Sequence, residues 1–355
     1  MKLAEKIGQL LMVGFEGTTP SKEVVTLIQK HQIGGVILFS RNIKTPAQCA
    51  KLTQSLQALS KNVPLLIGID QEGGRVSRLP KPFIQFPPAK VFGQINNIRL
   101  TYDCAVALSK ELNAVGINMN FAPVLDVDTN PDNPIIGDRA FGQNSLIVEE
   151  QALALMSGLQ DNHIIACGKH FPGHGDTNLD SHKTLPKLDH PMSRLNEMEL
   201  KPFIHLAKNG LWTIMTAHVL YSKIDAKRPA SLSKKIVTKL LREKIGFSGV
   251  IVSDDLEMKG ITEKISVAEA AVLAIEAGSD LLLICKSPDE QTAALEALIH
   301  AVEKEELSEE RIDRSIARLL ALKERAHLRM KQTLPEIKKI IGCDKHRALI
   351  DAISA

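Results

Sequence analysis

Short apolar runs alternate with amphipathic stretches along most of the chain. The runs are rich in Val, Ile and Leu and stay apolar at successive positions, as strands buried on both faces should. Eight of them are predicted as strands: Leu10–Phe15, Gly34–Phe39, Pro64–Asp70, Ile117–Val124, His163–His170, Trp212–Ala217, Gly249–Asp254 and Ser279–Cys285. Helices are predicted between them, among others at Pro46–Ser60, Arg99–Val115, Val148–Asp161, Ser193–Lys208, Ser233–Lys244 and Val267–Ala277.

This repeated strand–helix alternation favours a single (β/α)8 barrel of the α/β class over an open, doubly wound sheet. No GxGxxG sequence follows the first predicted strand, which argues further against a dinucleotide-binding fold. We expect one catalytic barrel domain over residues 1–330. Its last helix should span Ser308–Arg325, with Ser308 as the N-cap. Residues 331–355 should form a C-terminal helical extension that packs on the barrel or trails from it.

Composition and charge narrow the possible partners. The chain has 355 residues, 44% hydrophobic and 24% charged, which is ordinary for a globular protein. Its formal charge of +3 gives no sign of the concentrated basic face of a nucleic-acid binder. The N-terminus lacks the pattern of a signal peptide, and no stretch has the length and apolarity of a membrane span. We therefore expect a cytoplasmic monomer with no nucleic-acid or membrane partner.

The five cysteines are scattered and form no CxxC pair. This spacing argues against both a disulfide framework and a structural zinc site, and it fits a reducing compartment. We expect no cofactor.

Polar residues follow the ends of five predicted strands. The carboxyl ends of the strands of a (β/α)8 barrel meet at one rim, where the working groups of such enzymes lie. The sequences at these ends are Asp70 with Gln71–Arg75, Ala122–Asp128 followed by Gly137-Asp138-Arg139, Lys169-His170, Ala217-His218, and Ser253-Asp254-Asp255. Five polar strand ends converging on one rim indicate an active site.

The densest polar stretch, Lys169–His182, reads KHFPGHGDTNLDSH. It contains His170, His174 and His182 together with Asp176 and Asp180. These side chains could ligate a metal, as in a metal-dependent hydrolase. Alternatively, an Asp–x–His pair could act as a general acid/base whose imidazole is oriented by the carboxylate. A hydrogen-bonded loop without catalytic duty is the third possibility.

Further candidates are charged side chains on neighbouring strand ends. Because side chains alternate along a strand, Asp254 should project into the barrel mouth, while Asp255 should begin the next loop, where it could cap a helix. Asp70, Arg75 and Arg139 could bind sugar hydroxyls or a carboxylate. The alternative for these three is a salt bridge on the rim.

Taken together, these motifs resemble glycoside hydrolase family 3. The resemblance is carried by GIDQEGGR, by KHFPGHG with Asp180-Ser181-His182, and by Ser253-Asp254-Asp255. More narrowly, they are similar to the NagZ-type β-N-acetylglucosaminidases of bacterial cell-wall recycling. The similarity extends from about Leu10 to the last barrel helix.

The resemblance implies a retaining hydrolase without metal or cofactor. Its expected substrate is terminal, non-reducing β-linked GlcNAc on small fragments such as GlcNAc-1,6-anhydroMurNAc peptides. It implies Asp254 as the nucleophile, His182 as the acid/base and Asp180 as the residue that orients His182. The residues matching the sugar-binding positions are Asp70, Arg139, Lys169 and His170, with Arg75 and His174 expected in the same shell.

Three alternatives remain open. Another family 3 activity, such as β-glucosidase or β-xylosidase, would change the substrate but not the class of reaction. A metal-dependent hydrolase would use the His/Asp loop as ligands. A non-catalytic sugar-binding protein would have the cleft but no catalytic activity, although both the nucleophile and the acid position are present in this sequence.

Overall fold

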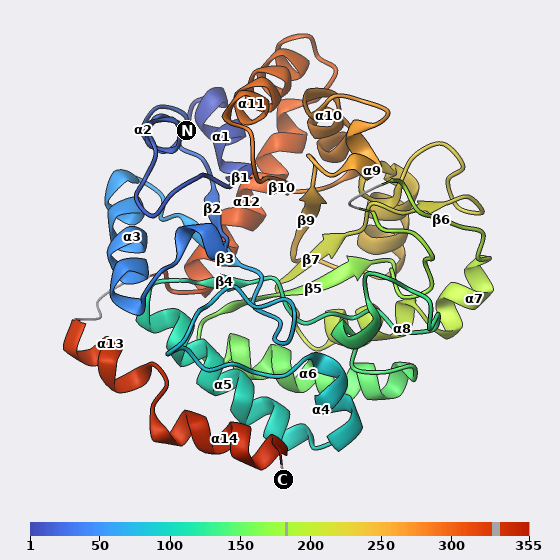
Figure 1. Cartoon of the computed structure of the whole chain (residues 1–355). Helices are drawn as coiled ribbons and strands as arrows, with labels where there is room; N and C mark the ends of the chain where they lie inside the picture. The colour runs from blue at the N-terminus through green and yellow to red at the C-terminus, as the bar shows by residue number, and fades with distance from the viewer. Residues whose placement is uncertain (182–183, 329–333, 355) are drawn as a thin grey trace.

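Eight parallel strands close into a barrel, which confirms the predicted (β/α)8 fold (Figure 1). The structure is a computed structural model and describes residues 1–181, 184–328 and 334–354. The barrel strands, in chain order, are β1 (Leu11–Val13), β2 (Gly35–Leu38), β3 (Leu66–Ile69), β4 (Met119–Asn120), β5 (Ile165–Phe171), β7 (Thr213–Thr216), β9 (Val250–Asp255) and β10 (Leu281–Ile284). Each strand pairs with its neighbours in sequence, and β1 pairs with β10 to close the ring.

Helices surround the strands in the order expected of this fold (Figure 1). They are α1 (Leu3–Gln9), α2 (Lys22–His31), α3 (Pro46–Leu59), α4 (Ala89–Ile95), α5 (Ile98–Ala114), α6 (Ser145–Gln160), α7 (Met192–Glu197), α8 (Leu200–Lys208), α9 (Lys259–Thr262), α10 (Val267–Ala277), α11 (Pro288–Glu303), α12 (Glu309–Arg325), α13 (Leu334–Ile340) and α14 (Asp344–Ser354). A further helix, hydrogen-bonded at wider spacing, spans Lys235–Lys244, and single turns lie at Ser40–Asn42, Gly137–Arg139 and Ala230–Leu232. A two-stranded sheet, β6 (Lys187–Leu188) and β8 (Leu220–Tyr221), lies beside the barrel.

Two predicted elements differ from the structure. The strand predicted at Ile117–Val124 is regular only at Met119–Asn120, because Pro123 has no N–H to donate to the ladder. The helix predicted at Ser193–Lys208 is two helices, separated where Met198 leaves helical geometry with φ −132°. The predicted N-cap of α12 is confirmed, since the Ser308 hydroxyl accepts a hydrogen bond from the Arg311 N–H at 3.2 Å.

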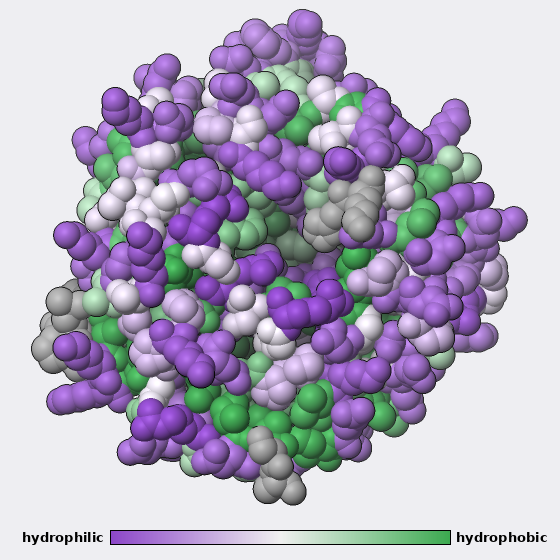
Figure 2. Space-filling view, viewed as in Figure 1, coloured by the Kyte–Doolittle hydropathy of each residue, from purple (hydrophilic) through white to green (hydrophobic). Residues whose placement is uncertain are grey.

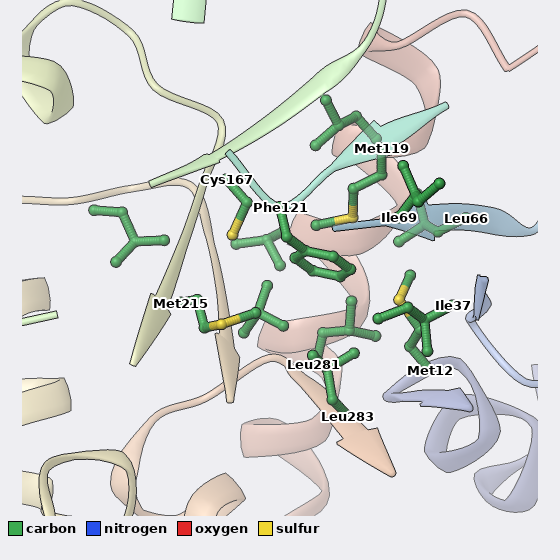
Figure 3. Close-up of a cluster of buried hydrophobic side chains, with 14 of the residues drawn as sticks. Met12, Ile37, Leu66, Ile69, Met119, Phe121, Cys167, Met215, Leu281 and Leu283 are labelled. Atoms are coloured by element: carbon green, nitrogen blue, oxygen red, sulfur yellow. The ribbon is translucent and has the colours of Figure 1, made fainter. Parts of the chain in front are cut away.

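Apolar side chains fill the barrel interior, so it is a core and not a channel. Figure 3 shows the labelled members of this cluster meeting from several strands around the barrel. Met12 and Phe121 are fully buried at its centre. Ile37, Met215 and Leu283 belong to the same core and also line the cavity at the carboxyl ends of the strands. The top of the core is therefore the floor of that cavity.

The last described helices, α13 and α14, lie along the outside of the barrel against α5 (Figure 1). Ile337 and Ile341 of this segment are 3% and 7% exposed and join the main hydrophobic core. None of the described helices combines the length and the apolarity required to span a membrane.

Candidate active site

A cavity of about 410 Å³ opens at the carboxyl ends of the barrel strands. Figure 2 shows the face of the molecule hollowed near its centre, with hydrophilic residues around the hollow. Every predicted site residue that the structure describes lines this cavity: Asp70, Arg75, Arg139, Lys169, His170, His174, Asp180 and Asp254. His182, the predicted acid/base, lies outside the described residues.

Lys169, at the end of β5, is held between two carboxylates. Its Nζ lies 2.7 Å from Asp70 Oδ1 and 2.6 Å from Glu72 Oε1, and its side chain is only 3% exposed. Burial alone would lower the pKa of Lys169, but Asp70 and Glu72 outweigh that effect and raise it. The ammonium is therefore charged at neutral pH and points its protons at fixed acceptors.

Glu72 joins Lys169 to Arg139. Arg139 Nε and Nη2 each donate to one Glu72 oxygen at 2.8 Å, which is the bidentate geometry that a guanidinium favours. Burial would raise the pKa of Glu72, but Arg139 and Lys169 hold that pKa well below its usual range. Asp70 is the more accessible carboxylate of this network, with 20% of its side chain exposed. It can accept hydrogen bonds from a ligand.

His170 is oriented by a buried carboxylate from the end of the fourth strand. Its Nδ1 lies 2.7 Å from Asp126 Oδ2, and Asp126 is fully buried. Arg139 Nη2 lies 3.5 Å from Nε2, and a guanidinium can only donate, so Nε2 is the acceptor and Nδ1 donates to Asp126. His170 also lines the cavity.

His174 has both ring nitrogens engaged within its own loop. The Thr177 hydroxyl donates to the His174 carbonyl at 3.1 Å, so it must accept from Nδ1–H at 2.8 Å. Nε2 then accepts from the Ser181 hydroxyl at 3.1 Å. Burial, with the neighbouring His170, lowers the pKa of His174 to about 4, so the ring is neutral near pH 7. These contacts favour a role in loop architecture over ligand contact.

Gly175 is required where this loop crosses the end of the fourth strand. A Cβ at this position would lie 1.7 Å from the Val127 carbonyl oxygen, which is far inside contact distance. The glycine therefore lets the loop lie directly on the barrel rim.

Asp254 and Asp255 both lie at the end of β9 and both line the cavity, which corrects the predicted geometry. Asp255 is the last residue of the strand and caps no helix, since α9 begins at Lys259 with Met258 as its N-cap. The Asp255 carboxylate accepts from the Glu257 N–H at 3.1 Å and from the Cys285 N–H at 3.3 Å. Because these two donors hold it, Asp255 is tied to its own loop and to β10.

The two carboxylates differ in their surroundings. Burial, together with the neighbouring Glu257 and Asp254 charges, raises the pKa of Asp255 to about 7. Asp254 Oδ1 accepts from the Asp255 N–H at 2.8 Å, which helps to fix that side chain. The Asp255 carboxyl is therefore the one of the pair that burial shifts toward the protonated form, while Asp254 Oδ1 is fixed by a backbone donor.

The sequence prediction did not single out every charged residue of the site, and Glu72, Asp126 and Arg78 are examples. Glu72 lies within the run that includes Asp70, and the alternation of side chains along an extended chain could have placed both on one face. Asp126 lies between two apolar residues in the run Ala122–Asp128, where a buried carboxylate needs a partner. Arg78 also lines the cavity, and nothing in its local sequence distinguishes it from a surface arginine.

Arg78 lines the cavity and has no anionic partner within residues 1–181, 184–328 and 334–354. Its Nε is buried and makes no hydrogen bond to any group in those ranges. By contrast, Arg75 pairs with Asp138 at 2.8 Å and Arg41 pairs with Glu16 at 2.8 Å. Arg78 can therefore donate to an anionic group in the cavity.

The described part of the chain contains no group of three or more His, Cys, Asp or Glu side chains arranged to hold a metal ion. Asp126 and Asp176, which could have served as ligands, are each hydrogen-bonded to a histidine, His170 and His190 respectively.

Comparison with known proteins identifies the family of the chain. The model of the glycosyl hydrolase family 3 N-terminal domain matches residues 2–322. A β-hexosaminidase of Methylobacillus flagellatus is 38% identical over 304 residues, which cover 84% of this chain and 86% of the relative. A family 3 β-N-acetylglucosaminidase structure from Paenibacillus superposes with a TM-score of 0.96 at 43% identity, covering all of this chain and 68% of that one. NagZ from Neisseria gonorrhoeae, in complex with N-trifluoroacetyl-D-glucosamine, superposes with a TM-score of 0.80 at 30% identity, covering 97% of each chain.

Proposed function

The chain belongs to glycosyl hydrolase family 3 and is a glycoside hydrolase, and from this premise we propose that it is a retaining β-N-acetylglucosaminidase. It would remove terminal, non-reducing β-linked GlcNAc from small glycan fragments. The observation that carries the proposal is the meeting in one cavity of Asp254 with a buried, charged network built on Asp70, Lys169 and Arg139. The names of the relatives support the choice of sugar.

Asp254 is the proposed nucleophile of a double displacement. Its carboxylate attacks the anomeric carbon while the bond from that carbon to the aglycone oxygen breaks, which gives a covalent glycosyl-enzyme. Water then attacks the same carbon and releases Asp254. Asp254 must act in its carboxylate form, because only that form is nucleophilic, and the Asp255 N–H that it accepts at 2.8 Å favours that form.

His182 is the proposed acid/base, with Asp180 as its orienting carboxylate. An imidazole with a pKa of about 6.5 can give a proton to the leaving oxygen and later take one from water. The chain just before His182 supports this placement. The Ser181 carbonyl accepts from the Gly260 N–H at 3.2 Å, and Gly260 belongs to α9, the short helix that follows β9. The loop that leads to His182 is therefore hydrogen-bonded to the segment that follows Asp254.

The sugar would be held by Asp70, Lys169, Arg139 and His170. Their charges are already paired with one another or with Glu72 and Asp126, so little reorganisation is needed when hydroxyl groups arrive. His170 Nε2 is an acceptor and Asp70 is a carboxylate, and both suit hydroxyl donors. Arg75 lines the same cavity and is engaged by Asp138, so its Nε is not free to donate to a sugar.

The unpaired Arg78 supports an aglycone that carries a carboxylate. N-acetylmuramic acid has such a group on its lactyl ether, so we propose fragments of the GlcNAc-anhydroMurNAc kind as substrates and peptidoglycan recycling as the role. Such small substrates would be available to a monomer in the cytoplasm.

Changing Arg78 to glutamine should slow hydrolysis of GlcNAc-MurNAc by about tenfold or more in kcat/KM. Hydrolysis of GlcNAc-GlcNAc, which has a neutral aglycone, should change by less than about threefold, because no charge is lost opposite it. The measurement compares both disaccharides on the wild type and on Arg78→Gln. Equal losses on both would remove the support that Arg78 gives to an anionic aglycone.

The activity itself is tested with nitrophenyl glycosides. The β-GlcNAc derivative should be hydrolysed with a kcat/KM about 10²-fold or more above the β-glucoside and the β-xyloside, because the acetamido sugar is the proposed substrate of this cavity. The same assay after dialysis against EDTA should give unchanged rates. Activity restored only by added zinc or manganese would favour the metal-dependent hydrolase. Binding of GlcNAc without turnover would favour the sugar-binding protein.

A further inference from the structure

A fully buried carboxylate joins three separate segments of the chain outside the cavity. Glu111 lies on α5 with no exposed surface. Its Oε2 accepts from the Ile84 N–H at 2.8 Å. Its Oε1 accepts from the Gly342 N–H at 2.8 Å and from His346 Nδ1 at 2.8 Å. One side chain thus holds a barrel helix, the loop between β3 and α4, and the segment that runs from α13 into α14.

The loop held at Ile84 is the one that carries part of the cavity wall. Residues 70–88 leave the end of β3, include Asp70, Glu72 and Arg78, and reach α4. Two residues beyond Ile84, the Phe86 carbonyl accepts from the Gly74 N–H at 2.9 Å. The Glu111 side chain is therefore linked to the chain near Glu72 through two hydrogen bonds and the intervening residues 84–86.

The same loop is touched a second time by the C-terminal segment. Gly342 has φ +60°, and a Cβ there would lie 2.2 Å from the Pro82 carbonyl oxygen. Ile337 and Ile341 bury their side chains on the adjacent surface. This segment lies beyond residue 322, where the match to the family model ends.

We propose that Glu111 is a positioning residue and that, with His346 and Gly342, it clamps the β3–α4 loop in the geometry that binds the sugar. The cluster of Glu111, Ile84, Gly342 and His346 is called the C-terminal clasp below. The inference rests on the proposed function for what the loop binds. The inference adds that the segment from α13 to α14 sets the affinity of the cavity for the sugar, although this segment does not line the cavity.

The clasp should act on KM more than on kcat. Glu72 orients Lys169 and Arg139, which would hold the sugar both before and during reaction. Loss of such uniform binding raises KM. Asp254 stands on β9, across the barrel from β3, so the loop of residues 70–88 does not carry it. The chemical step should therefore be largely retained.

The decisive variants are His346→Leu and His346→Asn. Leucine removes the donor to Glu111, whereas the asparagine amide places a donor near the position of imidazole Nδ1. His346→Leu should raise KM for nitrophenyl β-GlcNAc by about tenfold, with kcat within about threefold of the wild type. His346→Asn should recover most of that loss. In Glu111→Gln, the amide N–H₂ would face N–H donors in place of a carboxylate oxygen. This variant should therefore raise KM as His346→Leu does.

Two glycines supply a matched control. Gly342 and Gly210 both have positive φ, at +60° and +85°, so alanine strains the backbone at either position. A Cβ at Gly210 meets nothing within 4 Å, whereas one at Gly342 meets Pro82. Gly342→Ala should raise KM as His346→Leu does, and Gly210→Ala should lower only thermal stability.

Amide hydrogen exchange of the loop separates this inference from the proposed function. His346→Leu should speed exchange in the peptide covering residues 71–87 by about tenfold relative to the wild type, whatever the substrate proves to be. The proposed role of the C-terminal clasp would be overturned if His346→Leu and Gly342→Ala both kept the KM of the wild type and lost only thermal stability. If the wild type did not hydrolyse nitrophenyl β-GlcNAc, the proposed function would be overturned. Faster exchange of the loop in His346→Leu would still support the C-terminal clasp in that case.

Discussion

Asp254→Asn should lower kcat on nitrophenyl β-GlcNAc by about 10⁴-fold or more and leave the fold intact. The amide has nearly the shape of the carboxylate but cannot form the glycosyl ester. Asp254 lies at a strand end beside the cavity and outside the hydrophobic core, so the substitution should leave thermal stability within about 1 kcal/mol of the wild type. Steady-state rates and a thermal melt of the same preparation provide the measurement.

Asp255→Asn is the matched control, since it removes the neighbouring carboxylate. Asp255 is held by the Glu257 and Cys285 N–H groups, and an asparagine oxygen can still accept from them. We expect a loss of less than about tenfold in kcat. If Asp255→Asn were the inactive variant and Asp254→Asn retained its activity, the nucleophile would have to be reassigned.

The covalent step can be observed directly. A substrate with slow deglycosylation, quenched in acid, should leave one acetamido-sugar adduct on the peptide that contains Asp254. The adduct should be absent from Asp254→Asn and present in Asp255→Asn. An adduct on Asp255 in the wild type would contradict the assignment independently of the kinetics.

His182→Ala should show an effect that depends strongly on the leaving group. A disaccharide has a poor leaving group that needs protonation, so its kcat/KM should fall by about 10² to 10⁴-fold. A nitrophenyl glycoside leaves without much protonation, and its kcat/KM should fall by less than about tenfold. Because kcat/KM reports the glycosylation step, this comparison is not obscured by slower attack of water in the second step.

Asp180→Ala should show the same selectivity in weaker form, because the carboxylate orients the imidazole but does not carry the proton. A histidine with only a structural role predicts equal losses on both substrates, together with lower thermal stability. In that case the general acid would have to be sought elsewhere. His174 has both ring nitrogens engaged, and His218 is bound to the Ser231 hydroxyl and the Asp255 carbonyl, so His170 would be examined first.

The periodic pattern of the chain was enough to predict the barrel. Strands buried on both faces are apolar at every position, so each of the eight is recognisable from its own few residues. Closure of the barrel then places all carboxyl ends on one rim, and this explains why Asp70, Lys169, His170 and Asp254 could be grouped before any contact was known. The chemical roles came from motif resemblance and remain predictions until they are tested.

Only the tertiary structure decided which distant segments pair with one another. Glu72 and Arg139 are 67 positions apart, and Glu111 and His346 are 235 apart. No local pattern fixes such partners, because the path of each loop depends on packing around the whole barrel. The predicted position of Asp255 was wrong for a similar reason: β9 continues one residue beyond the predicted strand, because Asp255 pairs with Leu283 of β10 beside it. A sequence therefore determines which elements form and which rim they share, whereas the partner of each buried charge is set by the closed fold.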